Sequence, residues 1–169
     1  RSLTFLWNGI TGQIPAEVGN LINLENLTIH SNQLSGFIPP EIGNLTNLKY
    51  LKLTDNYNLT GSIPNEIGSL NNLIELKIGN HSDYPSQLSG EIPPEIGNLI
   101  NLEVLFLYHN QFTGSIPTEI GNLVNLDYLR LNNNQFTGSI PPQIGNLVNL
   151  TYFELGGNQF TGSIPPRDR

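Results

Sequence analysis

The chain has 169 residues, of which 37% are hydrophobic, and this is enough for one ordinary domain with a hydrophobic core. Its 7 basic and 14 acidic side chains give a formal net charge of -7, and no cluster of Lys or Arg is present that could neutralise nucleic-acid phosphates. Cysteine is absent, which excludes disulfides, thiolate chemistry and cysteine-based zinc sites, and no run approaches the roughly 18 apolar residues of a membrane span.

One sequence frame recurs along the whole chain. Residues 1–15 form the tail of a first copy, and the plainest complete copy runs from Gly121 to Ile144. Copies spaced by 24 to 29 residues are typical of the coils of a solenoid. Because the first and last copies are incomplete, we expect a fragment, or the ordered part, of a longer protein. The copies after the first begin at Gly19, Gly43, Gly68, Gly97, Gly121 and Gly145.

Each copy contains a short segment in which apolar and polar residues alternate, and this alternation predicts a β-strand. Stacked coils would align these strands into a parallel sheet. The Thr-Gly-Ser-Ile-Pro segment that follows excludes a long helix, and Glu-Ile-Gly-Asn-Leu leaves room for about one turn of helix or 3₁₀ helix. The apolar pairs of the expected strands are Leu3/Phe5, Leu27/Ile29, Leu51/Leu53, Leu76/Ile78, Leu105/Leu107, Leu129/Leu131 and Phe153/Leu155.

An asparagine recurs before the turn of nearly every copy. Its side-chain amide can pair the backbone groups that a tight bend leaves unsatisfied, so we expect a structural role. Two copies depart from the bare length: Tyr57 adds one residue, and the fourth copy carries five extra residues within 79–87. In that fourth copy, His81 takes the asparagine register, so we expect the insertion to remake the bend. The recurring residues are Asn8, Asn32, Asn56, Asn110, Asn134 and Asn158.

The combined pattern L-x-x-L-x-L-x-x-N-x-L/F-x-G-x-I-P-x-x-I-G-x-L resembles the plant-type leucine-rich repeat over essentially the whole chain. The resemblance implies a single α/β repeat solenoid over residues 1–169. This would be a right-handed, curved superhelix of about seven coils, with a parallel sheet on its concave side and short 3₁₀ or helical segments on its convex side. The Ser/Thr-Gly-x-Ile-Pro segments would form a second, smaller sheet.

The resemblance also carries expectations about function. Members of the family include ectodomains of plant receptor kinases, polygalacturonase-inhibiting proteins and secreted bacterial proteins, and most of them bind proteins or peptides. It therefore implies a secreted or cell-surface monomer. Plant ectodomains usually carry paired-cysteine caps, which this chain lacks, so a bacterial member or a truncated receptor-like ectodomain is the expected kind.

The outward positions of the strands form columns whose residues differ from coil to coil, and they gather aromatic and basic side chains on an acidic protein. Exposed Tyr and Arg are enriched at binding hot spots, which predicts a surface for a protein or peptide ligand, with carbohydrate as a further ligand class. Alternatively, bulky β-formers only shield the sheet. The candidate ligand-binding residues are Tyr50, Lys52, Lys77, Phe106, Tyr108, His109, Tyr128, Arg130, Tyr152 and Glu154.

The insertion in the fourth copy is a second candidate, because departures from a repeat often map to loops on a binding face. Its candidate residues are His81, Asp83 and Tyr84, and neutral drift is the alternative. Sequons mark candidate glycosylation sites in a secreted eukaryotic chain, although the repeat consensus itself generates Asn-Leu-Thr. These sites are Asn26, Asn44, Asn58, Asn80 and Asn149.

Catalysis, a metal and a cofactor are not expected. The three histidines lie in different coils, and no Ser/His/Asp set stands at motif spacing. One stacked glutamate per coil is far from the about six to eight oxygen ligands that calcium takes. The alternative to a recognition module is a structural or adhesin-type repeat, or a binder of polysaccharide or ice through regular Thr, Ser and Asn. The regular pairs are Thr113/Ser115, Thr137/Ser139 and Thr161/Ser163.

Overall fold

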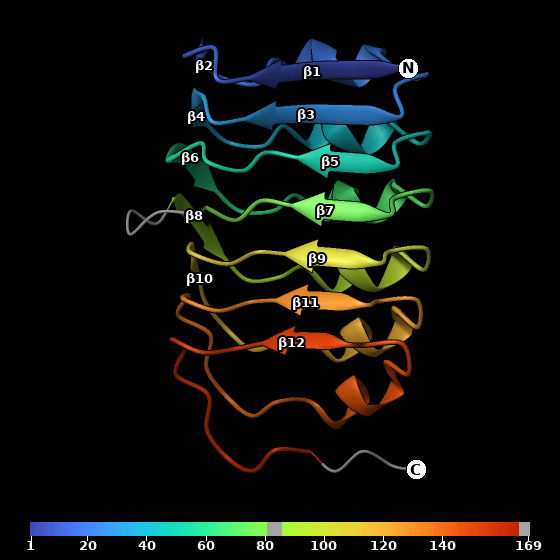
Figure 1. The fold of residues 1–169 in the computed structure, drawn as a ribbon, viewed down its shortest axis with the longest axis vertical. Helices are drawn as coiled ribbons and strands as arrows, with labels where there is room; N and C mark the ends of the chain where they lie inside the picture. Colours follow the sequence, from blue (N-terminus) through green and yellow to red (C-terminus); the bar gives the residue numbers. More distant parts are fainter. Residues whose placement is uncertain (81–85, 166–169) are drawn as a thin grey trace.

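The structure is a computed structural model that describes residues 1–80 and 86–165. Its coils stack along the long axis, so the first and the last described coils lie at opposite ends of the molecule (Figure 1). Most coils contain a strand of a main sheet, a turn, a short strand of a second sheet and a 3₁₀ segment that returns the chain. This is the repeat solenoid that the sequence predicts.

In the part of the chain that the structure describes, the main sheet is parallel and seven-stranded, with the order β1-β3-β5-β7-β9-β11-β12. Each pairing joins equivalent positions of adjacent coils; Tyr128, for example, is in register with Val104 and with Tyr152. The alignment of equivalent strand residues into columns, as predicted from the sequence, is therefore confirmed. The strands are β1 (Ser2–Leu6), β3 (Asn26–His30), β5 (Tyr50–Lys52), β7 (Glu75–Lys77), β9 (Val104–Phe106), β11 (Tyr128–Arg130) and β12 (Tyr152–Glu154).

A second, smaller sheet runs along one edge of the stack, and it was expected at the Ser/Thr-Gly-x-Ile-Pro segments. It is parallel and five-stranded, with the order β10-β8-β6-β4-β2. Its strands are short because, in each copy of the repeat, a glycine and a proline soon follow and end regular pairing. They are β2 (Thr11–Gly12), β4 (Gln33–Gly36), β6 (Asn58–Gly61), β8 (Gln87–Gly90) and β10 (Gln111–Phe112).

Within residues 1–80 and 86–165, six 3₁₀ segments lie on the face of the stack opposite the main sheet (Figure 1). A proline precedes each of them, and its fixed φ and missing N–H group suit the position just before the first helical turn. Each segment has five residues, because the strained 3₁₀ hydrogen-bond geometry disfavours longer runs. They are η1 (Ala16–Asn20), η2 (Pro40–Asn44), η3 (Asn65–Ser69), η4 (Pro94–Asn98), η5 (Thr118–Asn122) and η6 (Pro142–Asn146).

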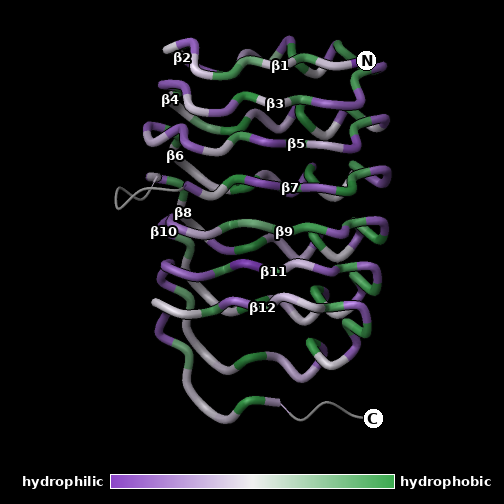
Figure 2. The backbone as a smooth tube through the Cα atoms, in the orientation of Figure 1, coloured by the Kyte–Doolittle hydropathy of each residue, from purple (hydrophilic) through white to green (hydrophobic). Residues whose placement is uncertain are grey.

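One hydrophobic core runs through all the coils. Leucine and isoleucine side chains from the strands and the 3₁₀ segments fill it, and many of them, such as Leu105 and Leu129, are fully buried. Near the C-terminal end, the rings of Phe112, Phe136 and Phe160 form a stack with interplanar angles of 13°. Figure 2 shows the hydrophobic positions recurring at equivalent places in successive coils. No coil could bury these side chains alone, so stability depends on the contacts between coils.

The recurring asparagine has the structural role that the sequence predicts. In the sixth coil, the side-chain amide of Asn134 donates to the carbonyl oxygens of Leu107 at 2.8 Å and Leu131 at 3.1 Å. Its Oδ1 accepts the backbone N–H of Phe112 at 3.1 Å. One buried side chain thus pairs backbone groups of two adjacent coils.

The fourth coil departs from this ladder in a way that the sequence prediction missed. Ser86 holds the place of the asparagine, because it precedes Gln87 of β8 as Asn110 precedes Gln111 of β10. Its buried hydroxyl donates to Oδ1 of Asn110 and accepts the backbone N–H of Leu88. His81, to which the sequence prediction gave this register, lies outside the described residues.

Candidate functional site

The outward side chains of the middle and C-terminal strands of the main sheet form one continuous surface. We call it the sheet-face patch. Side chains alternate between the two faces of a strand, so each leucine that points into the core places its neighbours on this surface. The sheet-face patch consists of Lys52, Glu75, Lys77, Phe106, Tyr128, Arg130, Tyr152 and Glu154.

An ion-pair triad occupies the part of the patch on β5 and β7. Nζ of Lys52 lies 2.7 Å from Oε2 of Glu75, and Nζ of Lys77 lies 3.2 Å from the same oxygen. Burial by itself raises the pKa of Glu75, but the two ammonium groups outweigh it and hold this pKa below its usual value. Glu75 was not among the predicted ligand-binding residues. The signal was present in the sequence, because Glu75 stands in the outward column beside two lysines.

Arg130 is the centre of the patch. Its guanidinium carbon lies 4.3 Å from the ring centre of Tyr108, 5.5 Å from that of Phe106 and 5.9 Å from that of Tyr152. Its Nε donates to Oε2 of Glu154 at 2.7 Å. Contacts between a guanidinium and aromatic faces are attractive, so the rings and the carboxylate hold Arg130 in one orientation on the surface.

Two tyrosines extend the patch toward the C-terminal end. The rings of Tyr128 and Tyr152 stack with their centres 6.1 Å apart, and 41% and 46% of these residues remain exposed. Lys77 lies over the ring of Phe106 in the next coil, with its Nζ 5.0 Å from the ring centre. The patch therefore combines exposed aromatic area with charged groups whose positions are fixed by neighbours.

Tyr108 does not belong to the exposed surface, contrary to the prediction from the sequence. It is only 2% exposed, and its ring lies against Gly79 of the preceding coil, where a Cβ atom would come within 2.8 Å of it. The guanidinium of Arg130, which comes from the following coil, lies over the same ring. Burial raises the pKa of Tyr108 to about 12, and the nearby positive charge of Arg130, which acts in the opposite direction, does not outweigh it.

The raised pKa of Tyr108 predicts a loss of stability at high pH. Because the folded state retains the phenol proton above the usual tyrosine pKa of about 10, this contribution is complete below pH 10 and is lost as the pH rises toward about 12. We expect the free energy of unfolding to fall more steeply over this interval for the wild type than for Tyr108→Phe, as measured by urea unfolding. Equal pH dependence of the two proteins would contradict this assignment.

The remaining predicted binding residues lie at the margins of the patch or outside the described residues. Tyr50 is half-buried beside Lys52, whose Nζ lies 5.4 Å from its ring centre. His109 follows β9, and its Nε2 lies 3.0 Å from Nδ2 of Asn133. The candidates from the insertion, which are His81, Asp83 and Tyr84, all lie outside the described residues.

The five sequons differ in their surroundings. Asn44 and Asn58 are exposed, whereas Asn80 is only 1% exposed and could not carry a glycan in this fold. The side-chain nitrogens of Asn26 and Asn149 are used in hydrogen bonds, to Ser2 Oγ at 3.1 Å and to the Val124 carbonyl at 2.9 Å. Among the described residues, Asn44 and Asn58 therefore remain the more accessible candidate glycosylation sites.

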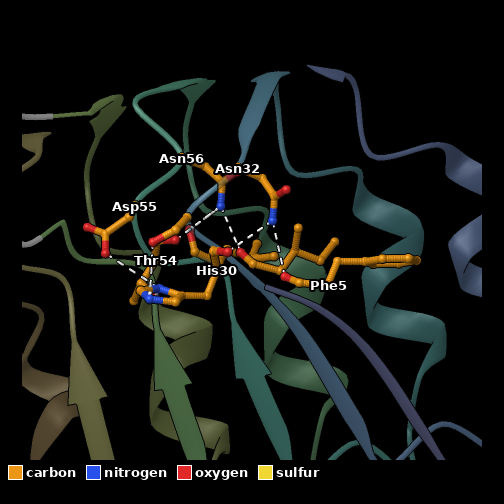
Figure 3. Close-up of polar contacts among 9 residues, drawn as sticks. Phe5, His30, Asn32, Thr54, Asp55 and Asn56 are labelled. Atoms are coloured by element: carbon orange, nitrogen blue, oxygen red, sulfur yellow. Dashed lines mark hydrogen bonds and ion pairs between the residues drawn. The ribbon is translucent and has the colours of Figure 1, made fainter. Parts of the chain in front are cut away.

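A polar network lies at the end of β3 and just after β5 of the main sheet (Figure 3). Nδ1 of His30 is 2.7 Å from Oγ1 of Thr54 and 3.4 Å from Oδ2 of Asp55. Two turn asparagines lie beside it, with the amide of Asn32 donating to the carbonyl of Phe5 at 3.1 Å. The network ties the outer strand ends of adjacent coils to the turns that follow them.

The described residues show no group of three His, Asp or Glu side chains that could hold a metal ion. Within 1–80 and 86–165, none of the helices is long and apolar enough to cross a membrane. What the site offers is a surface of aromatic, cationic and anionic side chains in fixed positions, which suits recognition by contact.

Comparison with known proteins agrees with the repeat pattern. A family model described as "Leucine Rich repeats (2 copies)" matches residues 100–138 and 124–168. A second model, "Leucine Rich Repeat", matches residues 23–45 and 47–70. Among curated proteins, none matches the chain.

Several solved structures share the fold. The ectodomain of the Arabidopsis receptor kinase HAESA, in complex with an extended IDA peptide hormone, is 40% identical over 92% of this chain and 25% of its own, with a TM-score of 0.85. The BIR3 and SERK2 complex from Arabidopsis thaliana gives 32% identity over 85% of this chain and 72% of that chain, with a TM-score of 0.69. A plant ice-binding protein gives 27% identity, coverage of 98% and 66%, and a TM-score of 0.65. The chain spans about a quarter of the length of the receptor ectodomains that it resembles.

Proposed function

Because this chain belongs to the plant-type leucine-rich repeat family, we propose that it is a non-enzymatic recognition module that binds a protein or peptide through the sheet-face patch. The similar structures include receptor ectodomains bound to peptide hormones, which supports an extracellular or cell-surface location and a ligand of this class. The proposal concerns residues 1–169 and does not extend to the full length of a receptor ectodomain.

The arrangement around Arg130 carries the proposal. A stacking guanidinium that is held by Tyr152 and Glu154 has lost its freedom before any ligand arrives, so binding does not have to order it. Tyrosine and arginine are also the residue types that dominate interface hot spots. The aromatic area of Tyr128 and Tyr152 supplies the apolar contact, and the charged rim supplies orientation.

Selection of peptides from a displayed random library tests the proposal without knowledge of the natural ligand. Peptides selected on the wild type should bind the double variant Arg130→Ala and Tyr152→Ala about 30-fold more weakly or worse, which corresponds to about 2 kcal/mol at a hot spot. The control Ser69→Ala and Asn122→Ala changes exposed positions on the 3₁₀ face and should bind as the wild type does. Selected peptides that bind all three proteins equally would refute the assignment to the patch.

A second candidate is recognition of ice or of an ordered polysaccharide, supported by a different surface. The second sheet and its continuation carry a hydroxyl side chain at the same position of the repeat frame in every coil. Paired strands are offset by two residues, so Ser35 is in register with Asn58 and Thr60 with Gln87. The plant ice-binding protein among the similar structures supports this candidate. Inhibition of ice recrystallisation by the wild type distinguishes it from peptide recognition. The hydroxyl residues are Thr11, Ser35, Thr60, Ser89, Thr113, Thr137 and Thr161.

A further inference from the structure

A groove of about 520 Å³ lies at the edge of the first three coils, between the ends of the main-sheet strands and the second sheet. Trp7, Asp55 and Tyr57 line it, together with Ser31 and Gln33. None of these residues belongs to the sheet-face patch. Trp7 is 75% exposed and Tyr57 is 38% exposed, whereas Asp55 is only 6% exposed. The groove thus has two open aromatic side chains and a largely buried carboxylate.

Trp7 departs from the repeat at a position where tryptophan is unfavourable. One register in the turn after the main-sheet strands has a positive φ in most coils, and Trp7, at this register in the first coil, has φ 58°. Asp55, His109 and Asn133 stand at this register in other coils, and Asx and His side chains tolerate that backbone conformation, whereas it is strained for a bulky residue. Burial does not offset the strain, because Trp7 is mostly exposed. Burial in the core and backbone geometry therefore do not account for a tryptophan here.

Tyr57 is a second departure that reaches the same groove. It is the single residue that the third coil adds to the frame, and the coil absorbs it in a turn closed by a hydrogen bond from the Leu59 N–H to the Asn56 carbonyl at 3.1 Å. The added side chain is not used in the core. A substitution in the first coil and an insertion in the third coil, 50 residues apart in the chain, thus place two aromatic side chains on one groove.

His30 holds the walls of the groove in place. Its Nδ1 lies 3.4 Å from Oδ2 of Asp55, and its carbonyl oxygen accepts the backbone N–H of Trp7 at 3.2 Å. The rings of His30 and Trp7 meet edge to face, with centres 5.1 Å apart and an angle of 86°. Figure 3 shows the side chains of Asp55 and Thr54 converging on His30. The aromatic and acidic groups are therefore positioned before a ligand binds, and His30 is a positioning residue.

We propose that this groove binds a basic side chain, a guanidinium or an ammonium group, of a protein or peptide. Tryptophan and tyrosine faces attract cations, and a carboxylate adds a charge-assisted hydrogen bond. Among the residues that the structure describes, no Lys or Arg lines the groove, and the net charge of -7 favours the approach of cations. The site is separate from the sheet-face patch, so it stands or falls independently of the function proposed for that patch.

The single tryptophan of the chain makes the test direct, since all tryptophan fluorescence reports on this groove. The probe is acetyl-Gly-Arg-Gly-amide, and its control is the same peptide with citrulline, which keeps the shape of arginine without its charge. We expect a saturable change in fluorescence with the arginine peptide. The affinity for the citrulline peptide should be lower than that for the arginine peptide by a factor of about ten or more. Equal responses to the two peptides, or no response to either, would overturn the proposal.

Variants connect the response to the groove. Asp55→Asn is compatible with the coil, because Asn133 stands at the same register with φ 55°, and it should weaken arginine binding about tenfold. Glu103→Gln removes the same charge from an exposed site elsewhere and should have no effect. Deletion of Tyr57 restores the bare repeat length and should also weaken binding, with folding checked by circular dichroism. Undiminished arginine binding by Asp55→Asn would show that the carboxylate of the groove does not hold the cation and would overturn the proposed site. A preference for a chitin or cellulose oligosaccharide over the arginine peptide would show that the ligand is not a cation.

Discussion

Replacing Gly97 by Ala is expected to lower the free energy of unfolding by about 2–3 kcal/mol, the usual range for overpacking. Gly97 lies in η4, and a Cβ atom there would stand 2.6 Å from the carbonyl oxygen and 2.7 Å from Cβ of Glu119 in η5. The obstacle is mostly backbone, so a rotamer change cannot relieve the clash, and the two 3₁₀ segments would have to separate. Urea unfolding followed by circular dichroism measures the loss.

The chain offers a matched control for this substitution. Gly156 has no atom within 4 Å of the position where its Cβ would lie, and its φ is not in the left-handed region. Gly156→Ala should therefore leave stability unchanged or raise it slightly by restricting the unfolded chain. If Gly97→Ala is as stable as Gly156→Ala, close contact between 3₁₀ segments does not explain the recurring glycine. The same close approach occurs at Gly19, Gly43, Gly68 and Gly121.

Replacing Asn134 by Ala is expected to cost about 3 kcal/mol or more. The substitution would leave the carbonyls of Leu107 and Leu131 and the N–H of Phe112 without their side-chain partner in a buried place, and each such group costs roughly 1–3 kcal/mol. Relaxation and water entry would recover part of the sum. The midpoint and slope of the urea transition should be measured together, because a solenoid can lose cooperativity when one interface weakens.

Two further variants separate the hydrogen bonds of Asn134 from its volume. Asn134→Asp keeps the shape but loses the amide donors and buries a charge, so it should be at least as unstable as the alanine variant. Asn122→Ala removes an exposed asparagine from η5 and should change stability by less than about 0.5 kcal/mol. A tolerant Asn134→Asp variant would mean that the amide donors do not stabilise the turn.

The sequence predicted the register of the coils well because each coil must satisfy the same local demands. An inward leucine at a fixed place, such as Leu129, sets which neighbours face outward, and the pairing of Tyr128 with Val104 and Tyr152 follows from stacking identical frames. The role of Asn134 could be predicted for the same reason, because the bend recurs in every coil. The alignment of the outward strand positions could therefore be predicted, whereas their role in ligand binding stays a proposal.

The tertiary structure alone decided what happens where a coil differs from its neighbours. Tyr108 is buried because the adjacent coil has Gly79 and the next one covers the ring with Arg130, and no property of its own coil indicates this. Ser86 takes the asparagine position because the chain re-enters the second sheet after the insertion at a place that residue counting cannot determine.

The groove at Trp7 shows the same division. The sequence by itself shows that Trp7 is out of place in its register and that Tyr57 is an added residue. Only stacking of the coils brings the two to one groove beside Asp55. Repetition in the sequence determines the frame, because each coil solves the same local problem of burial and hydrogen bonding. Individual sites depend on contacts between coils, whose partners are more than 20 residues apart in the sequence and are chosen by the stacking.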